Sequence, residues 1–462
     1  MEQLKISEIA EAVSGKLVTG NPEITVNSIS TDTRSLCHGN LFIALIGKNY
    51  DAHKFINDGI LKVAKCMIVS KLDNINLNNS ELPCIIHVAN TQQSLGDLAK
   101  YYRNKINPKV IAITGSNGKT TTKEMVYSIF SKYADVLSSS GNLNNLIGLP
   151  LTLFQLTGKH KYCIVELGIS FKGEMDKLAG ISIPDTGIIT NIGKTHLEFL
   201  NDEETVFNEK KKIVTLLSSG KTGIINNDDK YLQSLVKEKP GCNLLTFGVI
   251  NLFSDVTAQN IKVTAAGTEF DVISGKYKIN GHINLNIFGE YNVYNALAAI
   301  TAGLSERIDF SIIKAGIETF NPPKMRNEVK QLSGNINIIN DAYNSNPSSM
   351  AGSLSWFFNY ATGSRKIVVL GDMMELGKYS SAEHSRLGDF INENGRNKIA
   401  KIYLLGEEIK QTGKRIKNIP CEYFTGQDEL INRLKPELVP DTIFFFKASR
   451  GIGMDKVVDR LQ

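Results

Sequence analysis

The chain has 462 residues, of which 42% are hydrophobic and 21% are charged, and its formal net charge is +5. This length exceeds what one hydrophobic core usually serves, so about three domains of roughly 150 residues are expected. The sequence contains no block of basic residues typical of nucleic-acid binding. No stretch of the sequence approaches the ~18 apolar residues that span a bilayer. The amino terminus lacks the apolar core of a signal peptide. The six cysteines have no paired spacing, which argues against disulfides or a zinc site and favours the reducing cytoplasm.

The first hundred residues predict a small α/β domain. Apolar residues at helical spacing from Ile6 to Val13 indicate a short helix that stops near Gly15. A second helix carries Leu95 and Leu98 and leads to Asn107-Pro108, which predicts a domain boundary. Between the helices, β-like runs are expected at residues 24–29, 40–45, 66–69 and 84–88, and a polar surface loop at 74–80.

Beyond Pro108, strands and helices alternate regularly. Continuous apolar strands are expected at residues 110–114, 162–165, 186–190 and 222–226. The helical stretches between them predict a mostly parallel sheet that is covered on both faces. A more alternating β stretch at about 253–285 precedes a helix of small residues at 292–304.

Asn321-Pro322-Pro323 predicts a second linker. After it the α/β rhythm resumes, with strands expected at residues 336–340, 366–370, 401–405 and 442–446. The predicted fold class is therefore α/β with three domains. These are a small amino-terminal domain (1–107), a central P-loop domain with a mostly parallel sheet (108–321) and a Rossmann-like carboxyl-terminal domain (322–462).

A phosphate-binding turn is indicated at residues 111–121, Ile-Ala-Ile-Thr-Gly-Ser-Asn-Gly-Lys-Thr-Thr, between a strand and a helix. Glycines let backbone N–H groups surround phosphate oxygens, Lys119 can reach the terminal phosphates, and a threonine hydroxyl can bind Mg²⁺. The general pattern has another glycine where this chain has Ile113. The strand context and the Gly-Lys-Thr-Thr ending still favour a nucleotide site over a plain Gly/Ser turn.

Two further strands of the central domain end in chemically useful residues. In open α/β sheets, ligands bind beyond the carboxyl ends of the strands. One strand ends at Glu166, whose carboxylate suits Mg²⁺, and another ends at Asn191, with His196 just beyond. Alone, Glu166 could equally cap a helix and His196 could be structural, but their position in a sheet with a phosphate-binding turn favours function.

Three consecutive lysines, Lys210, Lys211 and Lys212, lie in a stretch that predicts a helix. From composition alone, a solvated helix face is the simplest interpretation of this cluster.

Taken together, these segments resemble the Mur ligases. Residues 114–121 look like that family's shortened P-loop, which accounts for the missing glycine. The stretch from His196 to Lys210 resembles its second signature, a metal-binding histidine followed by a helix with a carbamylated lysine. The spacing selects Lys210 over its two neighbours. Residues 288–296 resemble the Gly-x-His-Asn-x-x-Asn-x-x-Ala segment near the adenosine, with Tyr291 in place of the usual histidine.

Residues 339–347 resemble the Asp-x-Tyr-Asn-x-Asn-Pro signature of the family member that adds D-alanyl-D-alanine, and residues 371–377 are also typical of it. The resemblance implies that Asp341 contacts the ribose, while Asn344 and Asn346 face the incoming dipeptide. Arg326 matches a nucleotide-contacting arginine, although the glycine that often precedes it is missing. Residues 447–450, Lys-Ala-Ser-Arg, resemble a segment near the carboxyl end, and domain closure would bring Asp341 and Arg450 to the ATP.

The amino-terminal segments Ser30-Thr31-Asp32-Thr33-Arg34 and Asp51-Ala52-His53 resemble a uridine-diphosphate-binding domain. Residues 141–150 resemble the loop that lines the path of the muramoyl peptide, with an Asn/Gly turn as the alternative. The substrate-binding residues that the resemblance implies are Ser30, Asp32, Thr33, Arg34, Asp51, His53, Asn142, Asn144, Asn145, Asn344, Asn346 and Arg450.

The resemblance implies a monomeric, ATP-dependent ligase that joins D-alanyl-D-alanine to a UDP-N-acetylmuramoyl-tripeptide through an acyl phosphate. The implied nucleotide-binding residues are Gly115, Ser116, Asn117, Gly118, Lys119, Thr120, Thr121, Asn292, Asn295, Arg326 and Asp341. The implied catalytic residues are Lys119, His196 and Lys210. Two Mg²⁺ ions would be held by Thr120, Glu166, His196 and a CO₂-derived carbamate on Lys210.

Three alternatives share parts of this pattern. Folylpolyglutamate synthase and the tripeptide-forming Mur ligase have the P-loop and the lysine, but residues 341–347 disfavour both. A regulatory P-loop GTPase reads guanine with Asn-Lys-x-Asp, and this motif does not occur after Lys119.

Overall fold

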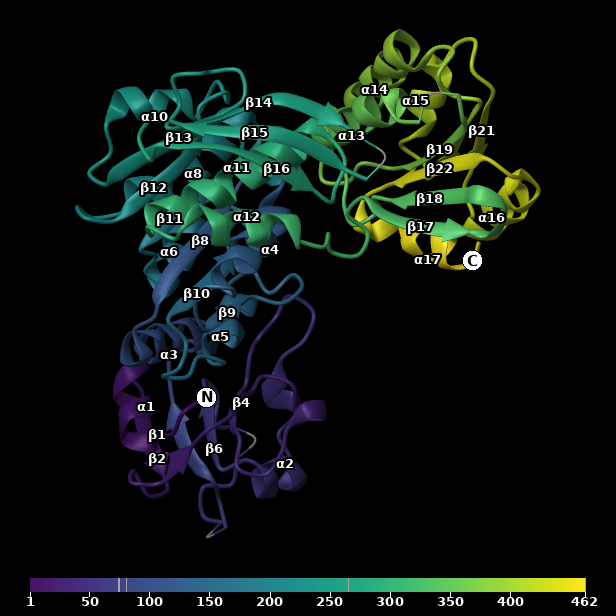
Figure 1. Ribbon diagram of the computed structural model, residues 1–462. Helices are drawn as coiled ribbons and strands as arrows, with labels where there is room; N and C mark the ends of the chain where they lie inside the picture. Colours follow the sequence, from purple (N-terminus) through teal and green to yellow (C-terminus); the bar gives the residue numbers. More distant parts are fainter. Residues whose placement is uncertain (74, 80, 265, 362, 462) are drawn as a thin grey trace. The chain divides into compact units, whose positions relative to one another are not determined.

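The structure, a computed structural model, describes residues 1–73, 75–79, 81–264, 266–361 and 363–461 (Figure 1). The chain divides into two compact units. Unit 1 comprises residues 1–113, 134–169 and 173–187, and unit 2 comprises residues 114–133, 170–172 and 188–462. This boundary runs through the predicted central domain, so the two domain boundaries expected after residues 107 and 321 stay a prediction. The loop predicted at 74–80 has both ends, Asn74 and Ser80, outside the described residues.

Unit 1 contains a five-stranded sheet in the order β2-β7-β6-β5-β4 and a two-stranded β1-β3 sheet. β2 is antiparallel to β7 and the other neighbours of the larger sheet are parallel. The run expected at residues 24–29 forms two short strands, β3 and β4, and the helix before Pro108 ends at the left-handed Asn107 as predicted. The elements are β1 (Leu4–Lys5), α1 (Ile6–Ala12), β2 (Lys16–Thr19), β3 (Thr25–Val26), β4 (Ile29–Ser30), β5 (Leu41–Ile43), α2 (Asp58–Val63), β6 (Cys66–Val69), β7 (Cys84–His87) and α3 (Thr91–Ile106).

Parallel strands follow in unit 1, where β8 pairs with β10 and β10 pairs with β9. Their residues are almost continuously buried, as the apolar runs predict for parallel strands covered on both faces. The boundary between the units falls within β11. These elements are β8 (Lys109–Thr114), β9 (Val136–Ser138), α5 (Gly148–Leu153), β10 (Tyr162–Glu166), α6 (Glu174–Ser182) and β11 (Thr186–Ile189).

Unit 2 begins with the helix after the phosphate-binding turn and continues through a β16-β15-β14-β13-β12 arrangement. β12, β13 and β14 are parallel, whereas β15 and β16 are antiparallel, which confirms the alternating β stretch. Helix α11 packs against α4. The elements are α4 (Lys119–Phe130), α7 (Leu197–Leu200), α8 (Glu203–Lys210), α9 (Lys212–Thr215), β12 (Thr222–Asn226), α10 (Gln233–Glu238), β13 (Asn243–Gly248), β14 (Val256–Val263), β15 (Thr268–Ser274), β16 (Ile279–Leu285), α11 (Glu290–Ser305) and α12 (Phe310–Glu318).

The rest of unit 2 is built on a six-stranded mixed sheet in the order β17-β18-β22-β19-β20-β21. Only β17, which pairs with β18, is antiparallel to its neighbour. The four predicted strands are β18, β19, β20 and β22, while β17 and β21 were not predicted. The elements are β17 (Glu328–Leu332), β18 (Ile336–Asn340), α13 (Pro347–Asn359), β19 (Arg365–Gly371), α14 (Ser380–Gly395), β20 (Lys401–Leu405), α15 (Lys410–Arg415), β21 (Cys421–Phe424), α16 (Gln427–Leu434), β22 (Thr442–Lys447) and α17 (Met454–Asp459).

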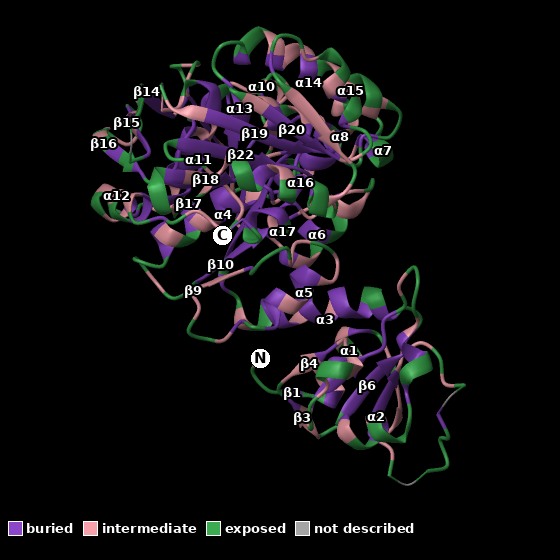
Figure 2. Cartoon of the chain, turned by 90° about the vertical axis from the view of Figure 1, so that its right-hand side faces the viewer, coloured by how far each residue is buried: buried purple, intermediate pink, exposed green. Residues whose placement is uncertain are grey.

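The inner strands β18, β22, β19 and β20 are largely buried, whereas the edge strands β17 and β21 are partly exposed (Figure 2). Phe445 packs with Leu354 of α13 on one face, whereas Phe444 and Phe446 pack with Leu430 of α16 on the other. Successive strand residues face opposite sides, so the Phe-Phe-Phe run fills both cores. In the described ranges, no helix is both long and apolar enough to cross a membrane.

Candidate active site

The turn between β8 and α4 has the backbone conformation of a phosphate-binding loop. Gly118 caps α4 with φ 79°, and Gly115 has φ 150°. A Cβ at Gly115 would lie 1.9 Å from Thr190 Oγ1, and a Cβ at Gly118 would lie 2.1 Å from Asn295 Oδ1. Only glycine fits either position, which is the physical reason for the glycine spacing in the sequence.

The segment after β11 holds this loop in place. Asn117 N donates to Asn191 Oδ1 over 2.9 Å, and Asn191 Nδ2 donates back to the Asn117 carbonyl over 3.1 Å. Ser116 Oγ donates to the Gly193 carbonyl over 3.1 Å and accepts from Gly193 N over 2.8 Å. Asn191, at the predicted strand end, therefore supports the loop backbone.

Lys119 lies at the first position of α4 and folds back over the loop. Its Nζ donates to the carbonyls of Gly115 over 2.9 Å and Ser116 over 3.3 Å. The ammonium group therefore lies at the mouth of the loop, where a phosphate could take over its hydrogen bonds. Thr120 and Thr121, the next two residues, are buried.

The first turns of α11 pack beneath the same loop. Asn292 Nδ2 donates to the Phe288 carbonyl over 2.7 Å, and Asn295 Nδ2 donates to Asn292 Oδ1 over 2.9 Å. Asn295 Oδ1 accepts from Thr122 Oγ1 over 3.2 Å. Both asparagines predicted near the adenosine are therefore buried supports of the P-loop helix.

The segment before α13 contacts the phosphate-binding loop directly. Asn346 Nδ2 donates to Asn117 Oδ1 over 2.7 Å, and Asn117 Nδ2 donates to Ser348 Oγ over 2.9 Å. Asn346 also caps α13, because its Oδ1 accepts from Ser349 N. Asn344 is exposed, so of the two asparagines expected to face the dipeptide only Asn346 is held by the loop.

Arg326 reaches the loop from the linker. Its Nη2 donates to Thr120 Oγ1 over 2.9 Å, and its guanidinium lies 4.1 Å from the centre of the Tyr343 ring. Stacking on the ring fixes the planar guanidinium beside the residue expected to hold Mg²⁺. The missing glycine before Arg326 therefore does not prevent this contact.

Asp341 is the centre of a second polar network. Lys447 Nζ lies 2.6 Å from Asp341 Oδ2, and both side chains are largely buried. Ser353 Oγ also donates to Asp341 Oδ2, over 2.8 Å. Arg450, expected to approach the ATP, is exposed and instead pairs with Asp455 at 2.9 Å.

His196 lies against a carboxylate that was not predicted. Its Nδ1 is 2.6 Å from Glu375 Oε2, and the contact lowers the pKa of Glu375. Nearby, Lys194 Nζ lies 2.7 Å from the buried Glu383 Oε1. Two carboxylates from the segment after β19 therefore hold the loop that carries His196.

The three lysines differ sharply in burial. Lys210 ends α8 with 1% of its surface exposed, so it is not part of a solvated helix face. Lys211 lies 5.0 Å from the Phe207 ring centre and 3.7 Å from Glu238, and Lys212 pairs with Glu209 at 2.8 Å. The residue selected by spacing is the buried one.

Unit 1 contains Glu166 at the end of β10. Its carboxylate is buried, and Asn144 Nδ2 donates to its Oε1 over 2.8 Å. Asn145 forms a turn through its Oδ1, which accepts from Ile147 N and Gly148 N, while Asn142 is exposed. The loop at residues 141–150 therefore contains the Asn/Gly-type turn that was the alternative interpretation, at Asn145, and also a contact with a buried carboxylate, at Asn144.

The predicted uridine-end residues lie in two turns of unit 1. Asp32 caps the turn Thr33–Ser35, and the exposed Arg34 guanidinium holds the pKa of Asp32 down to about 2. Ser30 Oγ donates to the Asp32 carbonyl over 2.9 Å.

Asp51 and His53 lie in the second turn, beside a pocket of about 140 Å³. Lys71 Nζ, 2.6 Å away, lowers the pKa of Asp51. His53 Nδ1 is 2.7 Å from Asp51 Oδ1, and its Nε2 accepts from Ser70 N over 3.0 Å. Both ring nitrogens are therefore engaged within the turn.

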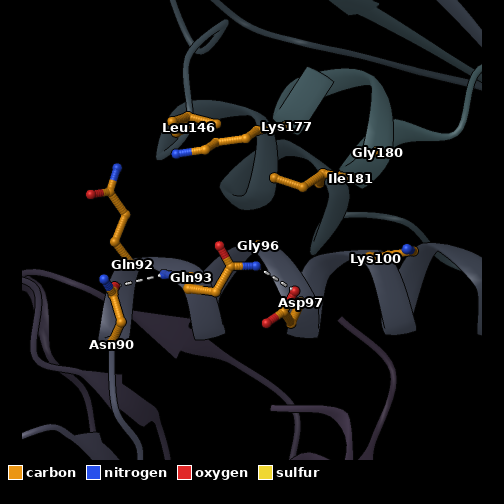
Figure 3. Close-up of a pocket in the computed structure, with 10 residues that line it drawn as sticks. All are labelled: Asn90, Gln92, Gln93, Gly96, Asp97, Lys100, Leu146, Lys177, Gly180 and Ile181. Carbon is orange, nitrogen blue, oxygen red and sulfur yellow. Dashed lines mark hydrogen bonds between the residues drawn. The ribbon is translucent and has the colours of Figure 1, made fainter. Parts of the chain in front are cut away.

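A larger pocket in unit 1, of about 260 Å³, lies between α3 and α6 (Figure 3). Gln92 and Lys177 extend along it and Leu146 closes one side. The residues that line it include no predicted site residue.

The side chains expected to hold Mg²⁺ suit that ion in their chemistry. The carboxylate of Glu166 and the hydroxyl of Thr120 each offer the oxygen that Mg²⁺ prefers. The imidazole of His196 offers a nitrogen, and Glu375 beside His196 Nδ1 leaves Nε2 as the nitrogen free to ligate. Among the described residues, no group of three or more His, Cys, Asp and Glu side chains forms a metal cluster by itself.

Comparison with protein families gives two matches. The Mur ligase middle domain matches residues 113–303, and the Mur ligase glutamate ligase domain matches residues 325–450. The chain belongs to the Mur ligase family, whose members use ATP and Mg²⁺.

Its relatives define one branch of that family. The UDP-N-acetylmuramoyl-tripeptide–D-alanyl-D-alanine ligase of Buchnera aphidicola subsp. Baizongia pistaciae is 35% identical over 100% of the chain and 98% of that protein. The enzyme of the same name from Bacillus subtilis is 32% identical over 99% of the chain and 98% of that protein.

Solved structures agree. MurF from Acinetobacter baumannii superposes with a TM-score of 0.91 at 29% identity, covering 100% of the chain and 99% of that structure. MurF from Thermotoga maritima in complex with ADP superposes with a TM-score of 0.83 at 23% identity, which shows a shared fold. The predicted three-domain α/β fold is confirmed.

Proposed function

We propose that this chain joins D-alanyl-D-alanine to the terminal carboxylate of a UDP-N-acetylmuramoyl-tripeptide, with ATP converted to ADP and phosphate. The observation that carries the proposal is the 2.7 Å hydrogen bond between Asn117 and Asn346. It joins the phosphate-binding loop to the Asp-Ala-Tyr-Asn-Ser-Asn-Pro segment that resembles the dipeptide-adding signature. The enzyme is proposed to act as a monomer in the cytoplasm, in the synthesis of peptidoglycan precursors.

A carboxylate must be activated before an amine can attack it, because its charge repels the nucleophile and oxide is a poor leaving group. Transfer of the γ-phosphoryl group to the peptide carboxylate gives an acyl phosphate and ADP. The amino group of D-alanyl-D-alanine then attacks the acyl carbon, and phosphate leaves. Positioning and charge neutralisation carry most of the catalysis in such transfers.

The residues of unit 2 fit the first step. Lys119 exchanges its contacts with the Gly115 and Ser116 carbonyls for the β- and γ-phosphate oxygens. Arg326, stacked on Tyr343, adds positive charge beside Thr120. Mg²⁺ would neutralise phosphate charge when bound, and the ligands proposed in unit 2 are Thr120, His196 and a carbamate on Lys210.

The second step requires a positioned dipeptide and an excluded solvent. The exposed Asn344 is proposed to bind the incoming dipeptide. Arg450 is proposed to approach the ATP once its pairing with Asp455 is released. Asn346 ties this segment to the phosphate-binding loop, so the amine and the acyl phosphate can be held close together. Exclusion of water protects the acyl phosphate from hydrolysis.

In unit 1, the uridine end is proposed to bind at Ser30, Asp32, Thr33 and Arg34 and in the pocket beside Asp51 and His53. Asn142 and Asn144 are proposed to border the muramoyl peptide. Because His53 uses both ring nitrogens for Asp51 and Ser70, its contribution is to fix the pocket wall.

A phosphate-release assay tests the proposal. Purified enzyme is given MgATP, a UDP-N-acetylmuramoyl-tripeptide and D-alanyl-D-alanine, and each component is omitted in turn. Release should require all three, and mass spectrometry should find the UDP-N-acetylmuramoyl-pentapeptide. Ligation of a single amino acid in place of the dipeptide, or stimulation by GTP but not ATP, would contradict the assignment.

A further inference from the structure

Asn327, the residue after Arg326, contains a buried acceptor without a donor. Only 3% of the residue is exposed, and its Oδ1 has no hydrogen-bond partner among the described residues. Buried polar atoms in folded proteins are almost always paired, so an unpaired one indicates a missing partner. The residue also has a left-handed backbone, with φ 54°.

The orientation of this side chain is fixed by its amide nitrogen. Asn327 Nδ2 donates to the Phe288 carbonyl over 3.4 Å and to the hydroxyl of Tyr291. A carbonyl can only accept, so a rotated amide would place two acceptor oxygens against each other. The Phe288 carbonyl therefore keeps the amide nitrogen facing it and the amide oxygen turned away, and the hydroxyl of Tyr291, which stands where the family usually has histidine, adds a second contact to the same nitrogen.

The neighbours of Asn327 belong to the nucleotide site. Arg326 donates to Thr120 of the phosphate-binding loop, and Asn327 N donates to Asp341 Oδ1 over 3.3 Å. Asp341, the expected ribose contact, already accepts from Lys447 and Ser353. The carboxylate is thus largely committed within the protein, while the adjacent Asn327 oxygen is not.

We propose that Asn327 is a nucleotide-binding residue whose Oδ1 accepts a hydrogen bond from the adenosine part of ATP, and that Tyr291 positions it. The donor is a ribose hydroxyl group or the exocyclic amino group of the base, since these are the donors that adenosine offers. This inference rests on the proposed ATP-dependent function and adds a residue to it. The unusual Tyr291 then has a role: its hydroxyl orients the asparagine that reads the nucleoside.

Binding measurements by calorimetry, without turnover, test the proposal. The ligands are ATP, 2′-deoxy-ATP, 3′-deoxy-ATP and purine riboside triphosphate. Each of the three analogues lacks one hydrogen-bond donor that ATP has. Wild-type protein should bind one analogue about tenfold more weakly than ATP, because a lost hydrogen bond leaves the buried oxygen unpaired. The identity of that analogue assigns the donor.

The informative variant is Asn327→Gly, because glycine accepts the left-handed backbone and removes only the side chain. It should bind ATP about tenfold more weakly than wild type and should bind the discriminated analogue as well as ATP. Tyr291→Phe should lose part of the same discrimination. Asn335→Gly is the matched control, since Asn335 also has a left-handed backbone (φ 58°) but is exposed and bonded to Asp441.

Unchanged discrimination in Asn327→Gly, with the thermal unfolding temperature of the control, would overturn the proposal and mean that the oxygen is paired with water. Unchanged discrimination in Tyr291→Phe would overturn the positioning role of Tyr291. A wild-type enzyme that ligates but shows no preference among the four nucleotides refutes only the proposed role of Asn327. A wild-type protein that does not bind ATP refutes the proposed function and this inference together.

Discussion

Glu375 Oε2 lies 2.6 Å from His196 Nδ1, and both residues have left-handed backbones, with φ 60° and 54°. Residues other than glycine rarely adopt this backbone conformation, and it persists only where the surrounding structure enforces it. Here Glu198 N donates to the Glu375 carbonyl over 3.2 Å. The two turns therefore hold each other, and the carboxylate is positioned to orient the imidazole.

Glu375→Gln should lower kcat about tenfold to a hundredfold, because His196 is proposed to bind Mg²⁺ and loss of the carboxylate partner of a metal-binding histidine generally costs that much. The measurements are steady-state kinetics and Mn²⁺ binding by electron paramagnetic resonance. Glu383→Gln is the control, since it removes the ion pair with Lys194 but leaves the contact of His196 intact. Equal losses of Mn²⁺ affinity in both variants would show that the loop, and not the His196 contact, is responsible.

Arg34→Ala should raise KM for the UDP-linked peptide about tenfold and leave KM for ATP almost unchanged. The side chain is 88% exposed and anchored only by Asp32 among the contacts observed, so its removal should cost binding and not folding. Arg415→Ala removes a comparable exposed pair with Asp389 and is the matched control. A rise in KM for ATP as large as that for the peptide would exclude Arg34 from the uridine end.

The fold was largely predictable because apolar runs and turn residues act locally. The strands at 66–69, 162–165 and 222–226 were expected from continuous hydrophobic residues and are β6, β10 and β12. Strand β17 was missed because Glu328, Lys330 and Gln331 make it polar, and its place at the sheet edge is set by pairing with β18. Edge pairing of this kind leaves little trace in hydrophobicity.

In the candidate site too, some features could be predicted from local sequence and others could not. The phosphate-binding loop could be predicted because its glycines are required at fixed places in the motif. A Cβ at Gly115 would clash with Thr190, and a Cβ at Gly118 would clash with Asn295. The contacts of Asn117 with Asn346 and of His196 with Glu375 join residues far apart in the chain, so no local pattern could reveal them. Burial of Lys210 was likewise invisible in composition, because three lysines in a row read as a solvated face.

Acid should destabilise the carboxyl-terminal sheet through Glu437. Burial alone would raise its pKa, but hydrogen bonds from Tyr403 and Arg365 hold the pKa at about 2, against an ordinary 4.5. A depressed pKa contributes stability that is fully present above the ordinary value and is lost as pH falls from 4.5 towards 2. The difference in pKa corresponds to at most about 3 kcal/mol, and solvent around the partly exposed Arg365 reduces this contribution to about 1–2 kcal/mol.

The corresponding measurement is urea unfolding of wild type and Glu437→Gln between pH 7 and pH 3. The difference in the free energy of unfolding should be largest at pH 7 and shrink below pH 4.5. Glu429→Gln, on the exposed face of α16, should show no such change. A Glu437→Gln difference independent of pH would mean that the side chain acts through packing and not through its charge.

Lys210 is buried at the end of α8, with 1% of its surface exposed. A protonated lysine has no lone pair for Mg²⁺ and would repel the ion, whereas a carbamate supplies anionic oxygen. Lys210→Ala should therefore nearly abolish ligation, and a small added carboxylate should partly restore it. Lys211→Ala and Lys212→Ala should have mild effects on activity, because these side chains pair with Glu238 and Glu209.

Incubation with ¹³C-labelled bicarbonate should give a carbamate resonance that is absent only in Lys210→Ala. Full activity of that variant, or a bare ammonium at Lys210 in a crystal of the Mg²⁺–ATP complex, would leave Lys210 as a buried structural cation.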